Sequence, residues 1–328
     1  MSALSTRLAS LRLTLAGIAA LIATVLATYR SGGTALYWVA LPLALLALNL
    51  LAAILTNRAF RLQSALLVFH VGLLAVLLLA AAGLFARFEG RVELVEGERF
   101  DAGRVETIGR GWLHRDRLAS IDVEQGSIEV DYRAGLQRAA TRSELLLAGE
   151  RRLVGDRVAA EIGGYRLLAT FNKGYALVLV WDDGIAKPTA GAMNFPSFPE
   201  FEWKQRNAWT TPAGEALDVE LVLPDRVPER GPWTLRRPSS DFEVVVRRAG
   251  RAAERVGPGG TLALRGGRLT VAELRLWMGY RIDANPLLPW TLAAAFLALG
   301  ALAVHFLQKF GQAETRVPGR AGAAEQVA

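Results

Sequence analysis

Two of the three histidines in this chain lie inside long apolar runs, where an imidazole is unusual. His70 occurs in Leu-Leu-Val-Phe-His-Val-Gly-Leu-Leu, and His305 occurs in Leu-Ala-Val-His-Phe-Leu. An ionisable group in such a run is costly to bury and is a functional candidate by default. Neutral imidazole is a good axial ligand of haem iron, and the Leu, Val and Phe side chains nearby suit the face of a porphyrin. Both histidines are therefore candidate cofactor-binding residues, and His70 is the candidate metal ligand, axial to haem iron.

Each histidine also has a structural explanation that needs no ligand. His70 could form a hydrogen bond between helices, and His305 could lie at the level of the lipid headgroups. His114, in Gly-Trp-Leu-His-Arg-Asp, lies outside the apolar runs. A lone histidine there is more often a surface or packing residue than a ligand. The sequence alone leaves both interpretations open.

The remaining sequence excludes several kinds of catalytic site. The chain has no cysteine, which excludes disulfides, thiol redox chemistry, cysteine zinc sites and covalent haem attachment to this chain. It contains no nucleophile elbow, P-loop, HExxH motif, calcium loop or GxGxxG motif. Asp182 and Asp183 form a carboxylate pair, but they occur in WDDG, which is typical of a turn. We therefore name no catalytic residue and expect no catalytic activity from this chain alone.

The composition indicates a membrane protein with a large water-exposed insert. Hydrophobic residues make up 52% of the 328 residues, yet 21% are charged. Nearly all of the charge lies between residues 87 and 285. The net charge of +7 comes from basic residues that are mixed with acidic ones. Because there is no block of like charges, we expect no binding to nucleic acid.

Four apolar runs are long enough to cross about 30 Å of hydrocarbon, which takes roughly 20 helical residues. They are Leu13–Thr28, Ala35–Leu55, Ala65–Ala86 and Leu287–Leu307. Basic residues are concentrated in the short segments on one side of these spans, and Arg30 stands alone on the other side. The concentrated ones are Arg7, Arg12, Arg58, Arg61, Lys309, Arg316 and Arg320. The basic side is predicted to be cytoplasmic, so both termini are cytoplasmic and residues 87–285 are extracytoplasmic. His70 and His305 are then both expected in the cytoplasmic half of the membrane.

The predicted organisation has four parts. Residues 1–86 form an N-terminal membrane segment of three helices, and residues 87–285 form a mostly β extracytoplasmic domain. Residues 286–310 form the fourth transmembrane helix, and residues 311–328 form a disordered cytoplasmic tail that is rich in Ala and Gly. Short alternating runs bounded by Gly, Pro, Asp or Asn predict the strands of a β sandwich or an open barrel.

Two details of the β domain follow from its turn residues and its aromatic residues. Gly266-Gly267 predicts a tight hairpin, and Asn172-Lys173-Gly174 predicts a turn between two strands. The segment 193–209 contains two prolines among large aromatic residues and is not typical of a strand. Its aromatic side chains either cover the core of the sheet or form a docking surface for a partner or the membrane.

Several short stretches resemble the ResB (CcsB) family of cytochrome c biogenesis proteins. They are FHVGLL from Phe69, FEGRVELVEGE from Phe88, RSELLL from Arg142, IGGYR from Ile162 and GYRIDANP from Gly279. The order of three spans, a β-rich exported domain and a closing span is also similar to that family. The resemblance covers most of residues 10–310. The chain is shorter than most family members, and the Asn-Pro of the family's mid-domain segment is replaced around residues 160–162.

The resemblance implies a multi-pass subunit of the bacterial cytoplasmic (inner) membrane that works in a haem-handling complex. Its partner would be a CcsA-like multispan subunit with a Trp-rich haem-binding loop, and together they would move haem b, bound non-covalently, to exported apocytochrome c. A thioredoxin-like reductant and membrane lipid are further expected partners. His70 matches the family's intramembrane histidine, whereas His305 rests on its predicted depth alone. This chain has no Trp-rich loop, so any haem-ligating (cytochrome c synthase) activity would belong to the complex.

A different class of function is also compatible with these residues. A structural or scaffolding subunit would dock an exported partner through its β domain without binding haem. His70 discriminates between the two hypotheses, because only the first one needs its imidazole.

Overall fold

The computed structural model describes residues 7–31, 36–223, 227–228, 230–237 and 241–314. The chain divides into two compact units. The helical unit comprises residues 1–88, 109–115 and 285–328, and the β unit comprises residues 89–108 and 116–284. The segment 109–115 therefore belongs to the helical unit, although the β unit precedes and follows it in the sequence.

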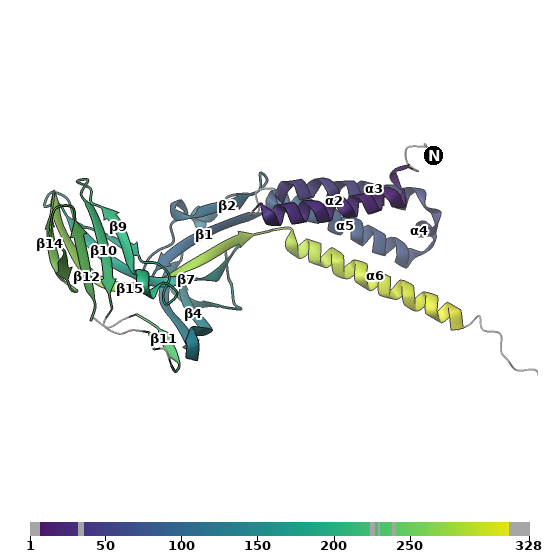
Figure 1. Cartoon of the computed structure of the whole chain (residues 1–328). Helices are drawn as coiled ribbons and strands as arrows, with labels where there is room; N and C mark the ends of the chain where they lie inside the picture. Colours follow the sequence, from purple (N-terminus) through teal and green to yellow (C-terminus); the bar gives the residue numbers. More distant parts are fainter. Residues whose placement is uncertain (1–6, 32–35, 224–226, 229, 238–240, 315–328) are drawn as a thin grey trace, which may run out of the picture. The chain divides into compact units, whose positions relative to one another are not determined.

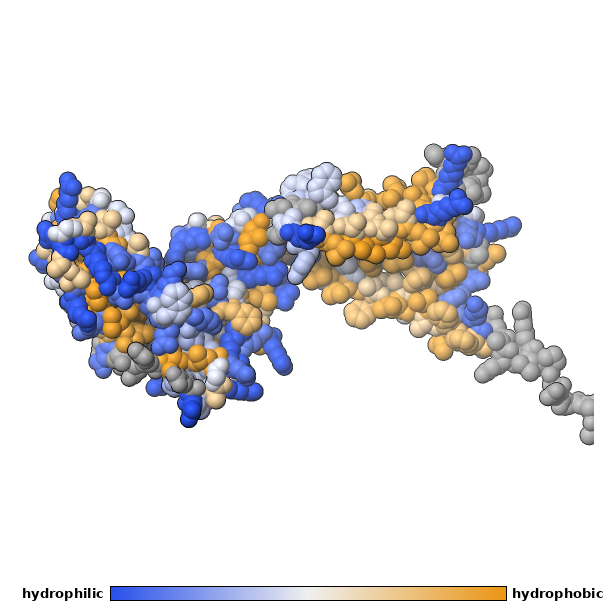
Figure 2. Space-filling view, in the orientation of Figure 1, coloured by the Kyte–Doolittle hydropathy of each residue, from blue (hydrophilic) through white to orange (hydrophobic). Residues whose placement is uncertain are grey.

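The helical unit contains four helices that are long and apolar enough to cross a membrane, as the sequence predicts. The helical elements are α2 (Leu11–Arg30), η1 (Leu36–Val39), α3 (Ala40–Thr56), the short α4 (Arg58–Leu62), α5 (Ser64–Ala86) and α6 (Leu288–Glu314). The helices leave many apolar side chains exposed, which Figure 2 shows as an apolar surface over this unit. Such exposure is unfavourable in water and is typical of contact with lipid.

Close approach of small residues brings these helices together. A Cβ atom on Gly72 of α5 would lie 3.0 Å from the Ala298 Cβ of α6. At the other end of α5, a Cβ atom on Gly83 would lie 3.4 Å from Asn285 Oδ1. These two contacts show that α5 and α6 run antiparallel, with backbones close enough for van der Waals packing.

The C-terminal boundary of α6 differs from the predicted one. α6 continues to Glu314, so residues 311–314 are helical rather than part of a tail. Gln, Ala and Glu in this stretch are all good helix formers, which explains the extension. The rest of the predicted tail, residues 315–328, lies outside the described residues.

The β unit is mostly strand, as predicted, and its strands form three sheets. The seven-stranded sheet has the order β2-β1-β15-β7-β6, with β14 on β15 and β8 on β7 (Figure 1). Its strands are β1 (Phe88–Val95), β2 (Glu106–Arg110), β6 (Ala160–Ile162), β7 (Tyr165–Asp182), β8 (Thr189–Asn194), β14 (Thr261–Leu264) and β15 (Gly267–Ala284). The prediction of a sandwich or an open barrel is not confirmed.

Two four-stranded sheets complete the β unit. One has the order β13-β12-β10-β9 and the other has the order β11-β3-β4-β5. Their strands are β9 (Arg206–Thr210), β10 (Ala216–Val222), β12 (Glu243–Arg248), β13 (Glu254–Val256), β3 (Glu124–Arg133), β4 (Gln137–Leu147), β5 (Glu150–Gly155) and β11 (Trp233–Leu235). The paired strands of these two sheets run antiparallel.

The two predicted turns have different outcomes. The hairpin at Gly266-Gly267 is confirmed, since β14 and β15 pair up to Leu264 and Gly267 around it. The turn at Asn172-Lys173-Gly174 is wrong, because β7 runs through all three residues. Lys173 and Gly174 pair with β15, and the register shifts at residues 170–172. Gly174 is needed for close packing instead: a Cβ atom would lie 2.9 Å from Trp277 Nε1.

Buried polar groups join the sheets of the β unit. The Tyr280 hydroxyl donates to Gln125 Oε1 at 2.7 Å and lies 2.5 Å from Ser143 Oγ. The Glu96 carboxylate accepts the backbone N–H of Ile128 at 2.9 Å, and burial raises the pKa of this carboxyl. These contacts give the Tyr280 hydroxyl and the Glu96 carboxylate partners inside the protein, which is what their desolvation requires.

Candidate functional site

His70 lies in the second turn of α5, with its side chain half-buried. Its Nδ1–H donates to the carbonyl oxygen of Leu66, one turn earlier, at 2.7 Å. Because a carbonyl oxygen can only accept, this bond fixes the tautomer with the proton on Nδ1. Nε2 then keeps its lone pair, which is the arrangement found in metal-ligating histidines.

Two phenylalanines hold the plane of this imidazole. The Phe60 ring of α4 stacks on it with centroids 4.1 Å apart, and Phe69 meets it edge-on at 4.9 Å. Stacking covers the face of an imidazole and leaves the nitrogen lone pair in the ring plane. The short helix α4, between α3 and α5, therefore orients His70 without blocking Nε2.

His305 is half-buried in α6, with its ring 5.7 Å from that of Phe306. α5 and α6 meet at Gly72 and Ala298. His70 lies two residues before Gly72 on α5, and His305 lies seven residues after Ala298 on α6. Because the two helices are antiparallel, both histidines are displaced from the contact in the same direction. At about 1.5 Å per residue, the two imidazoles are offset by roughly 7 Å along the helices. The structure therefore does not bring the two histidines to one level.

His114 is a packing residue at the C-terminal end of α5, although its sequence position is within the predicted β domain. Its ring stacks on Phe88 with centroids 5.1 Å apart, and its Nδ1–H donates to the Ala86 carbonyl oxygen at 3.3 Å. These contacts match the structural interpretation of this histidine.

The donor set in the described part of the chain suits a single axial bond to haem iron better than a classical metal centre. Among these residues no group of three or more His, Asp or Glu side chains could hold a metal ion. A structural or catalytic zinc needs three or four protein ligands, whereas haem iron takes its other four ligands from the porphyrin. The donor chemistry of His70 is thus compatible with one bond to haem iron.

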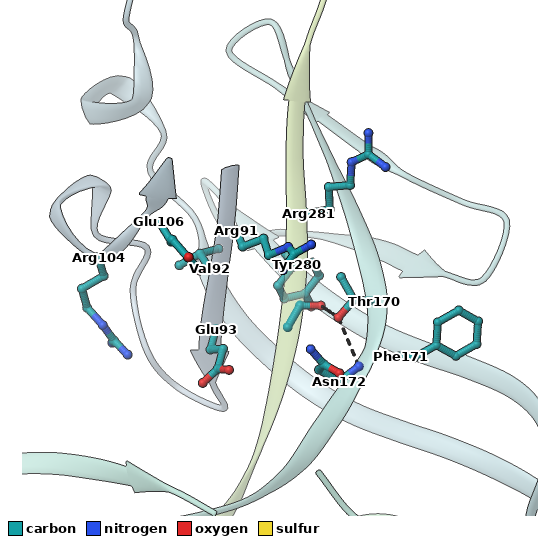
Figure 3. A pocket seen from close by; sticks show the side chains of 11 residues that line it. Arg91, Val92, Glu93, Arg104, Glu106, Thr170, Phe171, Asn172, Tyr280 and Arg281 are labelled. Atoms are coloured by element: carbon teal, nitrogen blue, oxygen red, sulfur yellow. Dashed lines mark hydrogen bonds between the residues drawn. The ribbon is translucent and has the colours of Figure 1, made fainter. Parts of the chain in front are cut away.

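The β unit contains a cavity of about 540 Å³ on the face of the seven-stranded sheet. Arg91 comes from β1, Tyr280 from β15 and Asn172 from β7, as Figure 3 shows. The lining also includes Glu93, Arg104, Glu106, Thr170, Phe171 and Arg281. Charges of both signs occur side by side, which suits the recognition of polar groups.

The aromatic segment 193–209 divides into a buried half and an exposed half. Phe195 and Phe198 are each 1% exposed and pack in the core, so this half is a cover. Phe201 and Trp203 are 46% and 79% exposed. Phe201 also lines a second cavity, of about 450 Å³, which shares Glu93 with the first one. The covering interpretation therefore applies to the first half of the segment, and for the exposed half the docking surface stays a prediction.

Sequence reasoning missed the burial of three charged residues in the described part of the chain, Glu96, Lys173 and Arg248, of which Lys173 is the most buried. The Lys173 side chain is 1% exposed, and its Nζ donates to Glu200 Oε1 at 2.5 Å and to the Phe171 carbonyl oxygen at 3.0 Å. Burial lowers the pKa of this lysine. The scarcity of lysine in the chain, with four against 34 arginines, was the only signal, and it does not indicate burial.

Comparisons with known proteins include a likeness to a solved structure. No protein-family model matches the chain, and no curated protein matches it. A solved structure of the cytochrome c heme lyase CcmF superposes with a TM-score of 0.27 and 16% sequence identity, over 89% of this chain and 34% of that protein. The chain thus spans about a third of the length of that protein. The function proposed below rests on the residues of this chain.

Proposed function

We propose that this chain is a ResB-like membrane subunit of the cytochrome c biogenesis machinery, which helps to move haem across the membrane and to present it to exported apocytochrome c. The observation that supports this proposal is the state of His70. Its imidazole lies in a helix long and apolar enough to span a membrane, and its Nδ1 is bound within that helix. The nitrogen that remains, Nε2, is the one that can bind iron.

The alternative structural role of His70 predicts a bond to another helix. The hydrogen bond that His70 makes within the described residues goes instead to Leu66 of its own helix. A bond of this kind ties the ring to α5 and does nothing to join α5 to its neighbours. It therefore supports a ligand role for the ring.

The offset between His70 and His305 bears on which residues of this chain would hold haem. By helix geometry the two imidazoles are roughly 7 Å apart along the helices. His70 would hold the haem iron through Nε2, and a CcsA-like partner subunit would supply a further ligand. His305 remains a candidate for contact with the same cofactor.

The second candidate function is a scaffold that docks an exported partner through the β unit without binding haem. The exposed Phe201 and Trp203 favour it, because aromatic residues are enriched where proteins make contact. The haem function requires the imidazole of His70 as a ligand, whereas the scaffold function does not.

The test is the haem content of the chain purified in detergent with its neighbouring multispan subunit. His70→Ala should remove the Soret band and stop cytochrome c maturation, while the protein still inserts. Exogenous imidazole should restore haem binding in part, because it can occupy the space left by the ring.

His70→Asn is the matched control, since an amide can replace a hydrogen bond but is a poor iron ligand. Under the haem proposal Asn fails as Ala does. Wild-type haem content and normal maturation in both variants would leave the scaffold as the function.

A further inference from the structure

The segment 109–115, which we call the interface loop, is bound by its backbone to the C-terminal end of α5. The Gly111 N–H donates to the Arg87 carbonyl oxygen, and the Leu113 N–H donates to that of Phe85, both at 2.8 Å. From η1, the Tyr37 hydroxyl donates to the Arg110 carbonyl oxygen at 2.6 Å. Three hydrogen bonds thus fix the loop to the place where the apolar helix ends.

Gly111 is the residue that allows this close approach. A Cβ atom at this position would lie 2.0 Å from the Phe85 carbonyl oxygen, so any other residue would displace the loop. His114 closes the loop, because its N–H donates to the Gly111 carbonyl oxygen at 3.0 Å and its ring stacks on Phe88. The loop therefore has one defined conformation on the helix end.

In this conformation the loop exposes its two largest apolar side chains. Trp112 is 74% exposed and Leu113 is 50% exposed. Trp112 lies 5.7 Å from the Phe85 ring, and Tyr37 lies 6.1 Å from that ring on η1. The exposed Trp112 and the half-exposed Tyr37 thus share one level with the last turn of α5.

This level is where a membrane interface falls if α5 spans the bilayer. Tryptophan and tyrosine are enriched at that interface, where the ring meets acyl chains and the polar atom meets headgroups. Two exposed arginines, Arg110 and Arg115, flank Trp112 and Leu113 in the sequence, and arginine side chains favour lipid phosphates. In water alone, nothing would offset the exposure of a tryptophan and a leucine on a rigid loop.

We propose that the interface loop inserts Trp112 and Leu113 into the headgroup and upper acyl region of the bilayer, at the C-terminal end of α5. The partner of this surface is lipid. The loop lies between two stretches of the β unit in the sequence, so it adds a third membrane attachment of that unit besides α5 and α6. This anchoring does not depend on haem and holds equally for the scaffold function.

The chain has no cysteine. A single introduced cysteine is therefore the only residue that a thiol-specific label can modify, which allows a direct test. Nitroxide labels on Trp112→Cys and Leu113→Cys of the full chain would be measured by electron paramagnetic resonance in phosphatidylcholine and phosphatidylglycerol vesicles. Power saturation measures how often each label collides with a relaxing reagent. Collision with oxygen, which is concentrated in the acyl chains, indicates contact with lipid. Collision with a water-soluble nickel chelate indicates exposure to water. Leu78→Cys, exposed on α5, is the lipid control, and Ile185→Cys, 92% exposed in the β unit, is the water control.

We expect the ratio of oxygen access to nickel access at positions 112 and 113 to lie clearly above that at 185 and below that at 78, as the headgroup and upper acyl region requires. Nickel access equal to that at 185 would overturn the proposal, and so would exclusion of both reagents, which would indicate a protein partner. Brominated lipid provides a measurement without cysteine. It should quench the fluorescence of the unaltered chain more than that of Trp112→Phe, and equal quenching would contradict lipid contact.

Discussion

The two units of this protein differ in the hydrogen-bond partners of their polar side chains. In the β unit, buried polar side chains such as Tyr280, Glu96 and Lys173 bond to protein partners on other strands or segments. In the helical unit, His70 bonds only its own helix among the described residues and keeps one nitrogen for a ligand. The difference teaches that bonds between strands and segments satisfy the buried polar groups of the β unit, whereas a lone imidazole among apolar residues is a functional candidate.

Asn49 shows that the contrast does not simply separate membrane helices from β strands. This buried residue of α3 donates from Nδ2 to the Leu8 carbonyl oxygen at 2.6 Å, and its Oδ1 accepts from the Thr14 hydroxyl at 2.7 Å. Asn49 therefore joins α2 to α3 and is fully engaged in that role. Of these two polar residues, His70 is the one with a ring nitrogen, Nε2, outside its hydrogen bond to Leu66.

The largest expected effect in the β unit comes from Lys173. Lys173→Ala removes a buried charge that contacts Glu200 and leaves a cavity, so we expect a loss of about 3 kcal/mol in the stability of the β unit. Unfolding of the full chain in detergent, followed by the β signal in circular dichroism, measures it. Haem content per folded molecule should not change.

Lys173→Met is the matched variant, because it fills the same space without a charge. It should lose half of that stability or less, since Glu200 is partly exposed and can be hydrated. Loss of haem from folded Lys173→Ala would contradict the idea that Lys173 acts only on the stability of the β unit.

A smaller effect is expected from the buried hydroxyl of Tyr280. Tyr280→Phe removes the bonds to Gln125 and Ser143 and leaves their buried polar atoms without a partner, which costs about 1–3 kcal/mol. Tyr132→Phe is the control, because the Tyr132 hydroxyl is buried and has no hydrogen-bond partner within the described residues. Its removal should be neutral or stabilising. Equal destabilisation by both changes, in the same unfolding experiment, would contradict the role given to the Tyr280 bonds.

The sequence predicts features that depend on local pattern and misses those that depend on distant neighbours. Continuous hydropathy identifies the four spans, and Gly266-Gly267 identifies its hairpin, because each signal lies within a few residues. Asn172-Lys173-Gly174 has the composition of a turn, yet pairing with β15 and contact with Trp277 keep it in a strand. The docking of the interface loop onto Phe85 joins residues that are more than twenty positions apart. His70 is a candidate from the sequence alone because an imidazole is exceptional within its apolar run, and its role as a ligand stays a prediction.

The smallest expected effect is a pH dependence that Glu96 gives to the β unit. Burial raises the pKa of this carboxyl above its usual 4.5, so the folded state binds the proton more tightly than the unfolded state does. The resulting stabilisation is fully present below pH 4.5 and is lost as the pH rises through the folded-state pKa. Glu96→Gln does not titrate and keeps an oxygen to accept the Ile128 N–H. The difference in melting temperature, wild type minus Glu96→Gln, should therefore fall between pH 4.5 and pH 7. A difference that stays constant or grows over this range would show that the Glu96 carboxylate is as stable inside the fold as in water.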